Sequence, residues 1–318
     1  MQILTAALWR VGKTVATLLL LSLVLFWLLS LISGDAASAR LGSTGGVEQV
    51  AALRHTLGLD QPFITRYISW LVQVLHGDFG YSYASGEPVM PLVIARGKAS
   101  LLLGVMTLAM LIPLAILLGL WSGLHEGHWG DRLIGVLSLG LLGTPEFVTG
   151  TLLVVLLSFT LHWLPALSLW HDGMTYSEWA MIMVMPVLTL LSVCLAQNVR
   201  LIRAGTIAAT RSEACQMARL NGFSEWQVIV HWIMPMAMIT YFPLLARYIT
   251  ALLSGALIAE TLFSWPGLAS TLLEATQSRD VPIIMAIATL ICTFTVIINA
   301  LVDMLAQLAS PAARRGQS

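Results

Sequence analysis

Residues 99–123 read ASLLLGVMTLAMLIPLAILLGLWSG, a run without a charged side chain. A helix needs about 20 consecutive apolar residues to cross the roughly 30 Å hydrocarbon core of a bilayer. The run therefore predicts a transmembrane helix. Further largely apolar runs of sufficient length lie at residues 14–33, 133–161, 179–199, 233–257 and 283–308.

The composition of the whole chain agrees with this interpretation. Hydrophobic residues make up 58% of the 318 residues and charged residues only 10%, whereas soluble domains carry about 25% charged residues. The mean hydropathy is +0.85. We expect an all-α membrane protein with about six transmembrane helices. The zero net charge gives no support for a nucleic-acid partner, which a basic face would favour.

The first run has two interpretations. Arg10 and Lys13 precede it, and the sequence Ala-Ser-Ala at residues 37–39 resembles a signal-peptidase site. The apolar run of about 20 residues is longer than the roughly 7–15 residues of a signal peptide. We therefore favour an uncleaved anchor, with residues 1–33 as tail and first helix.

The distribution of Lys and Arg predicts the orientation, because short cytoplasmic loops carry an excess of both. With the N-terminus inside, Arg279 is the basic residue of the short outer loops, and residues 34–98 form an extracytoplasmic segment. Residues 99–309 then form a five-helix core, and residues 310–318 a cytoplasmic tail. The basic residues on the cytoplasmic side would be Arg10, Lys13, Arg132, Arg200, Arg203, Arg211, Arg219, Arg314 and Arg315.

Several predicted spans contain helix-breaking or charged residues. The sequence Gly-Thr-Pro at residues 143–145 interrupts the third span, and Pro186, Pro235 and Pro243 lie in the next two. These residues indicate either ordinary kinks or a water-filled transport path.

Polar residues inside the predicted spans have the same two interpretations. Charge in a bilayer is costly, so Glu146 and Arg247 should face the bundle interior. Either they form a structural pair or helix-end contacts, or they line a pathway with Pro145 and Gln197.

The cytoplasmic loop 204–232 predicts two short helices joined by a tight turn. Thr210 with Glu213, and Ser224 with Gln227, fit capping boxes. Gly222, after Asn221, suits the left-handed end of the first helix. A plain connecting loop is the alternative, and a DNA-binding helix-turn-helix does not suit a segment between membrane spans.

Residues 216–222, QMARLNG, resemble the "EAA" loop of ABC importer permeases, whose short helix docks on a cytoplasmic ATPase. Ala218 and Gly222 match the pattern, whereas Gln216 and Met217 stand where the family has Glu and Ala. The resemblance implies an ATPase-coupling role for Gln216, Met217, Ala218, Arg219, Asn221 and Gly222.

Residues 255–268, GALIAETLFSWPGL, are similar to a stretch of the B-type permeases of dipeptide, oligopeptide and nickel importers. Residues 57–62 (LGLDQP), 77–80 (GDFG) and 144–147 (TPEF) match that family in the same order. The resemblance places an outer loop at Glu260, Trp265, Pro266 and Gly267.

The family resemblance implies a type I importer permease in a bacterial inner membrane, with both termini cytoplasmic. Expected partners are a homologous second permease, two cytoplasmic ATPase subunits, a solute-binding protein and membrane lipid. The cargo would be a peptide or a related solute, such as nickel, a metal chelate or an opine-like compound. A secondary transporter and a non-transporting membrane subunit are the alternatives.

We expect no catalytic, cofactor or metal site in this chain, so the partner ATPase would use ATP and Mg²⁺. Residues 7–14, ALWRVGKT, fit a relaxed phosphate-loop pattern but precede a membrane span instead of following a strand. His125 and His128 do not have the spacing of a zinc helix. His162, His171 and Asp172 in an outer loop are a weak alternative for a metal-bearing cargo.

Overall fold

The computed structural model describes residues 2–31, 47–56, 60–170, 173–253 and 256–309. Residues 37–39, His171, Asp172 and the tail 310–318 lie outside this part, and so does the side chain of Arg247. Within the described residues the secondary structure is helical, with one isolated β-bridge between Tyr81 and Pro88. This agrees with the all-α membrane fold predicted from the sequence.

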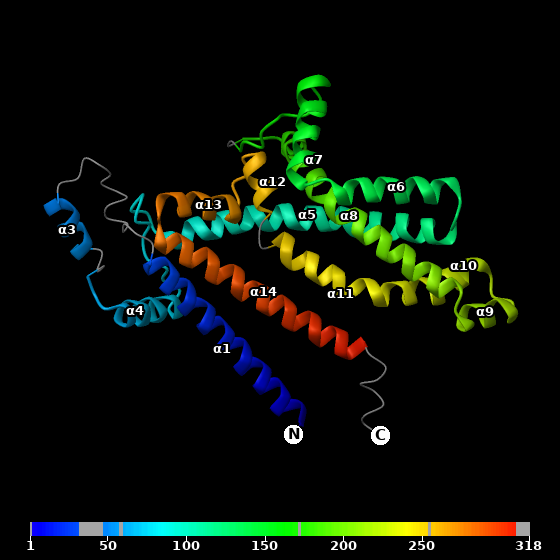
Figure 1. Cartoon of the computed structure of the whole chain (residues 1–318), viewed down its shortest axis with the longest axis horizontal. Coiled ribbons are helices and arrows are strands. Elements are labelled where there is room, and N and C mark those ends of the chain that lie inside the picture. Colours follow the sequence, from blue (N-terminus) through cyan, green and yellow to red (C-terminus); the bar gives the residue numbers. More distant parts are fainter. Residues whose placement is uncertain (1, 32–46, 57–59, 171–172, 254–255, 310–318) are drawn as a thin grey trace. The chain divides into compact units, whose positions relative to one another are not determined.

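The helices in chain order are shown in Figure 1. They are α1 (Gln2–Ser30), α3 (Val47–Thr56), α4 (Phe63–Leu75), α5 (Val89–Leu124), α6 (Trp129–Gly143), α7 (Glu146–Leu153), the π-helix η2 (Val154–Thr160), α8 (Tyr176–Thr210), α9 (Glu213–Leu220), α10 (Glu225–Val228), the π-helix η3 (Ile229–Ile233), α11 (Met234–Leu253), α12 (Leu257–Leu262), α13 (Leu268–Ser278) and α14 (Val281–Ala309).

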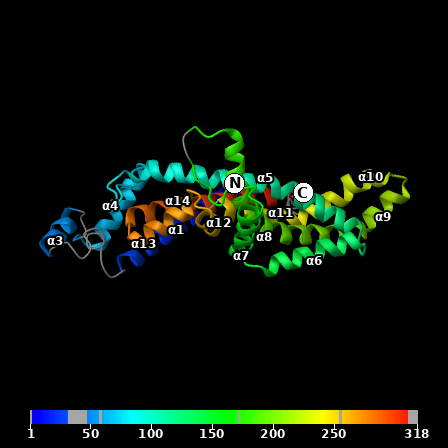
Figure 2. The same ribbon diagram turned by 90° about the horizontal axis from the view of Figure 1, so that it is seen from above.

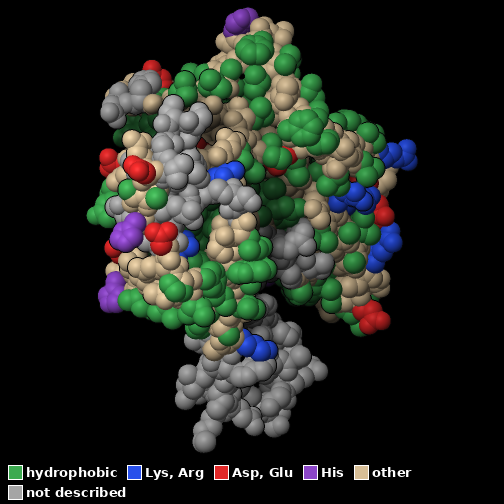
Figure 3. Space-filling model, turned by 60° about the vertical axis from the view of Figure 1, so that its left-hand side comes forward, with side chains coloured by type: hydrophobic (Ala, Val, Ile, Leu, Met, Phe, Trp, Pro, Cys, Tyr) green, Lys and Arg blue, Asp and Glu red, His purple; other side chains and the backbone are tan. Residues whose placement is uncertain are grey.

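Four described helices are long and apolar enough to cross a membrane, within α1, α5, α8 and α14. The bent pair of Trp129–Gly143 and Glu146–Thr160 makes a fifth if it is counted as one span. The 20-residue helix α11 occupies the remaining predicted span. Hydrophobic side chains accordingly cover much of the face drawn in Figure 3.

The break predicted in the third span is present, and it is sharp. Thr144 is extended after α6, Pro145 is the N-cap of α7, and the two helices meet at 107°. Pro145 cannot donate a backbone hydrogen bond, which favours a helix start at this position. The Thr144 hydroxyl donates to the Gly140 carbonyl at 2.7 Å, which satisfies one acceptor at the end of α6.

Pro186, in contrast, lies inside α8 without ending it. A helical proline leaves the carbonyl four residues earlier without its usual donor. The Ser168 hydroxyl donates to that carbonyl, of Ile182, at 2.6 Å. The backbone group freed by Pro186 is therefore satisfied by a loop residue outside the helix.

The chain divides into two compact units, and the boundary at Ala99 falls within α5. In unit 1, Met1–Ala99 with Pro266–Ile297, an apolar cluster joins the start of α5 to α13 and α14. The carboxylate of buried Asp280 accepts from the Ser82 hydroxyl and from the backbone amides of Tyr83 and Ala84. This contact fixes the loop before α5 to the start of α14.

In unit 2, Ser100–Trp265 with Ile298–Ser318, α5 and α8 approach closely at two glycines. A Cβ added at Gly119 would lie 2.6 Å from the Cβ of Ile202, and one at Gly123 2.6 Å from the Cβ of Thr206. Small residues four apart allow membrane helices to pack with their backbones close together. Both views show α6, α8 and α11 running beside one another in this unit (Figures 1 and 2).

We predict that Gly119→Ala and Gly123→Ala each destabilise the purified protein, by about 1–3 kcal/mol, because the new methyl overpacks the contact. Gly135→Ala and Gly140→Ala are matched controls in α6, where an added Cβ meets nothing within 4 Å. The controls should be neutral or stabilising. Thermal unfolding followed by tryptophan fluorescence measures the difference, and equal unfolding temperatures in both pairs would contradict the close packing.

Candidate coupling site and transport pathway

Helix α9 begins and ends at residues that cap it. Ser212 is its N-cap, and the Cys215 amide donates to the Ser212 hydroxyl. At the other end Gly222 has φ +81°, in the left-handed region where glycine is favoured. The predicted helix end at Asn221 and Gly222 is confirmed.

The predicted capping box of Thr210 with Glu213 is wrong. Helix α8 continues through Thr210, whose hydroxyl donates to the Thr206 carbonyl at 2.8 Å inside that helix. Ser212, which has an extended backbone, takes the N-cap role instead. The second predicted box is confirmed, because Ser224 and Gln227 cap α10 reciprocally.

One face of α9 packs against the ends of the membrane helices. Buried Cys215 and Ala218 join a core with Ala209 at the end of α8 and with Val228 and Ile233 of the following segment. Arg219 pairs with Glu225 at 3.0 Å, which ties α9 to α10. The short helices α9 and α10 are therefore fixed to each other at the end of α8 (Figure 1).

The segment of α9 and α10 also exposes large apolar side chains. These four side chains, which we call the α9 patch, are Met217 (61% exposed), Leu220 (81%), Phe223 (44%) and Trp226 (73%). Gln216 and Asn221 are also exposed. Several exposed large apolar side chains in one short segment are typical of a protein interaction site.

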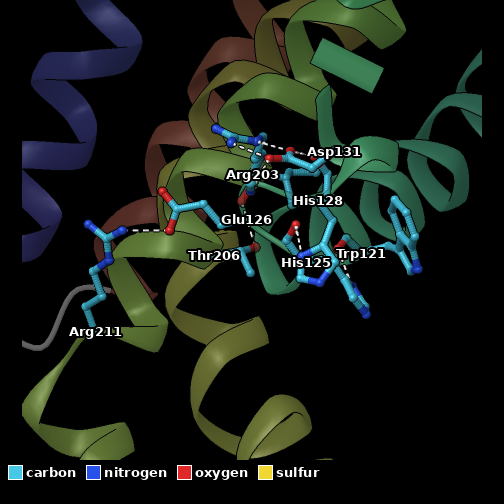
Figure 4. A network of polar contacts seen from close by, with 11 residues as sticks. Trp121, His125, Glu126, His128, Asp131, Arg203, Thr206 and Arg211 are labelled. Atoms are coloured by element: carbon cyan, nitrogen blue, oxygen red, sulfur yellow. Dashed lines mark hydrogen bonds and ion pairs between the residues drawn. The ribbon is translucent and has the colours of Figure 1, made fainter. Parts of the chain in front are cut away.

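A partly buried ion pair lies where α5, α6 and α8 meet, near the start of α9 (Figure 4). Asp131, 3% exposed, accepts from Arg203 through Nε at 2.5 Å and through Nη2 at 2.8 Å. The Ser122 hydroxyl and the Gly127 amide also donate to the Asp131 carboxylate. One carboxylate thus fixes the end of α5, the α5–α6 turn and α8.

The neighbouring residues of the turn are more exposed. Arg211, the C-cap of α8, pairs with Glu126 at 2.6 Å, and both side chains are largely accessible. The His125 ring stacks on Trp121, with centroids 4.9 Å apart. In the described part of the chain no group of three or more His, Cys, Asp or Glu residues is arranged to hold a metal ion.

The predicted pathway residues lie at the break and along α8. Pro145 and Glu146 start α7, and the buried Oε1 of Glu146 has no hydrogen-bond partner among the described residues. Thr149, one turn later, also has a buried, unpartnered hydroxyl there. Gln197 is exposed on α8 and accepts from the Tyr248 hydroxyl at 2.5 Å. A Glu146–Arg247 pair falls outside what the structure describes.

The residues predicted for an outer loop are largely buried. Glu260 is 0% exposed and accepts from the Ser100 hydroxyl at 2.5 Å. Trp265 is also 0% exposed, and its ring packs edge-on against Trp170 and Trp179. These two side chains do not reach a partner's surface in this conformation.

Pro266 is placed differently from Glu260 and Trp265, because its side chain is half-buried. Gly267 is buried and is the N-cap of α13. Of the four residues predicted for the outer loop, Pro266 is therefore the one that is partly accessible in this conformation.

Sequence reasoning missed the Asp131–Arg203 pair and the partners of Glu260 and Trp265. The available signal was Asp131 itself, an acidic residue directly before an apolar run, with Arg203 among the basic residues after another. The distribution of Lys and Arg predicts only that Arg203 lies on the cytoplasmic side, and it does not pair Arg203 with Asp131. Spacing along the chain does not show that two helix ends meet.

Comparisons with known proteins agree with this geometry. Residues 115–315 match the family described as "Binding-protein-dependent transport system inner membrane component", and residues 3–103 match its N-terminal family. A probable peptide ABC transporter permease protein of Sinorhizobium fredii is 27% identical over 305 residues, 96% of this chain and 97% of the relative.

The alignment with a second relative covers a similar share of both chains. The glutathione transport system permease protein of Salmonella typhimurium is 29% identical over 306 residues, 96% of this chain and 97% of its own. A crystal structure of an amino acid ABC transporter with histidines matches with a TM-score of 0.50 at 19% identity. It covers 68% of this chain and 94% of the solved chain, and it supports the fold alone.

The helical bundle, the capped α9 and the family matches over both halves of the chain lead to one assignment. The chain belongs to the binding-protein-dependent transport system inner membrane components, as an ABC importer permease of the peptide family.

Proposed function

We propose that this permease forms half of a translocation pathway for a peptide or a peptide-like solute, and that α9 couples it to a separate ATPase. Relatives named for peptide and for glutathione transport support this cargo class. Nickel, metal chelates and opine-like compounds remain within the wider expectation from the sequence.

The observation that carries the coupling proposal is the α9 patch. Met217 and Leu220 are exposed on α9, on the side away from Cys215 and Ala218, which pack against the bundle, and Phe223 and Trp226 are exposed next to it in the sequence. A short helix with one anchored face and one free apolar face suits docking into a groove of a partner protein. The partner ATPase subunits would bind ATP and Mg²⁺, and this chain would bind neither.

The contacts of α9 support its role as a lever. Its buried face touches Ala209 at the end of α8 and Ile233 just before α11, so a displacement of α9 acts on both helices. The Asp131–Arg203 pair would carry the displacement to the α5–α6 turn. Rigid elements linked in this way can rock between two openings, as in alternating access.

The assembly implied by this role contains further subunits. A homologous second permease would complete the pathway, a solute-binding protein would deliver cargo outside, and two ATPase subunits would bind inside. Both termini would then be cytoplasmic, as the distribution of Lys and Arg predicts.

The surroundings of the Glu146 carboxylate support the hypothesis of a polar path through the bundle. Its buried Oε1 and the buried Thr149 hydroxyl lack partners among the described residues, beside the 107° break. Unsatisfied polar groups at membrane depth cost several kcal/mol unless water or a solute reaches them. We propose that Glu146 lines the path and contacts a cationic group, such as the amino end of a peptide.

The same carboxylate would serve the alternative function, a secondary transporter that relays protons. The two functions differ in their need for an ATPase. Transport into vesicles that lack ATP and any ATPase would establish the alternative.

For the α9 patch, we predict that Leu220→Glu abolishes co-purification of the ATPase with the tagged permease from its native membrane in mild detergent. The second permease should still be recovered, because Leu220 lies on the free face. Leu220→Met, which keeps the apolar surface, is the control and should retain the ATPase. Mass spectrometry identifies the subunits, and an ATPase still bound to the Glu variant would contradict the proposed docking face.

For the Asp131–Arg203 pair, we predict that Arg203→Met lowers the unfolding free energy by about 1–3 kcal/mol, because the buried Asp131 carboxylate loses its cation. Arg211→Met removes the exposed pair with Glu126 and should cost less than about 1 kcal/mol. Adding Asp131→Asn to Arg203→Met should recover part of the loss. Thermal unfolding in detergent measures these changes. Similar losses of stability in Arg203→Met and Arg211→Met would contradict the greater contribution of the Asp131–Arg203 pair.

For the pathway, we predict that Glu146→Gln reduces uptake in proteoliposomes at least severalfold while membrane abundance stays normal. Thr151→Val is a control on the exposed side of α7, where the hydroxyl donates to the Phe147 carbonyl of its own helix. Reduced abundance with normal uptake per molecule would show that Glu146 only supports packing.

A further inference from the structure

Helix α4 has three distinct sides. The first is apolar and faces α1, with Phe63, Tyr67, Trp70 and Val74 partly buried. The second is apolar and exposed, and we call it the α4 stripe: Ile64 (67% exposed), Ile68 (53%), Val72 (49%) and Leu75 (77%). The third is polar, with Thr65, Ser69 and Gln73 at intervals of four residues.

The side of α4 that faces α1 contacts α1 well before the C-terminal end of that helix. The Tyr67 hydroxyl donates to the Leu19 carbonyl at 3.2 Å and pairs with the Ser22 hydroxyl at 2.9 Å. The Phe26 ring lies 5.6 Å from that of Phe63, 5.7 Å from that of Tyr67 and 6.0 Å from that of Trp70.

These contacts place α4 at membrane depth. The apolar span in α1 runs from Gly12 to Ser30, and only 11% of it is buried inside the protein. Ser22 lies eight residues before Ser30, which is about 12 Å along a helix. The hydrocarbon core is about 30 Å thick, so Tyr67 reaches well inside it.

The features of α4 itself fit the same position. At 13 residues it is too short to cross a bilayer. An amphipathic helix of this kind lies along the membrane plane, with its apolar side in the acyl chains. The Arg66 guanidinium lies over the Phe26 ring, 5.6 Å from the ring centre.

We propose that α4 is a membrane-embedded helix docked on α1, and that the α4 stripe contacts lipid acyl chains. Helix α1 also exposes large apolar side chains, which include Leu20 (62% exposed) and Trp27 (51%). The lipid is that of the leaflet reached by the C-terminal half of α1, the outer one in the predicted orientation. Part of the segment 34–98 thus belongs to the membrane region instead of the extracytoplasmic space.

The test uses nitroxide labels on the full transporter in phospholipid nanodiscs. Ile68→Cys places a label on the α4 stripe, and Ser69→Cys and Gln73→Cys place matched labels on the polar side. Native Cys194 and Cys215 are buried, and Cys292→Ala removes the half-buried third thiol. Power saturation measures collisions of each label with oxygen, which partitions into lipid, and with a water-soluble nickel chelate.

We expect the ratio of oxygen to nickel collisions to be severalfold higher at residue 68 than at residues 69 and 73. A label at residue 68 that meets the nickel chelate as often as the controls would place the stripe in water and overturn the proposal. A label protected from both reagents would show that a protein partner, such as the second permease or the binding protein, covers the stripe. That result would also overturn it.

Discussion

The Asp131 carboxylate determines how the α9 end of the bundle is held together. Apolar membrane helices slide and rotate against one another easily, because their contacts with each other resemble their contacts with lipid. Asp131 accepts from Arg203, Ser122 and Gly127, which come from α8, α5 and the turn. These directional bonds fix the rotation of α8, and α9 follows α8 directly. A docked partner can move the bundle only if this connection is stiff.

Asp280 provides a comparable connection in unit 1. Its buried carboxylate accepts from the Ser82 hydroxyl and two backbone amides, so the loop before α5 is fixed to the start of α14. In the described part of each unit, a buried acid therefore fixes a loop to a long helix. In both cases the donors are several, as a buried charge requires to offset the loss of water. Hydrogen bonds supply the orientation that apolar packing leaves open.

Much of this arrangement is predictable from the sequence, and the exceptions share a cause. Apolar runs predict the spans, and residues 143–145 predict the break, because both depend on local chemistry. The end of α9 at Gly222 follows from glycine's freedom at positive φ. The cap at Ser212, the buried Trp265 and the Ser168–Ile182 bond depend on which distant segments meet. A single sequence contains no signal for such contacts between distant segments.

The placement of α4 extends this reasoning to the membrane boundary. The polarity of residues 34–98 predicts an extracytoplasmic segment, since hydropathy averages over all sides of a helix. α4 carries polar residues on one side only, and its contacts with Leu19, Ser22 and Phe26 lie within the span of α1. A helix held at that depth needs lipid, or an equally apolar protein, against Ile64 and Ile68. The membrane therefore takes part in positioning a segment that composition assigns to water.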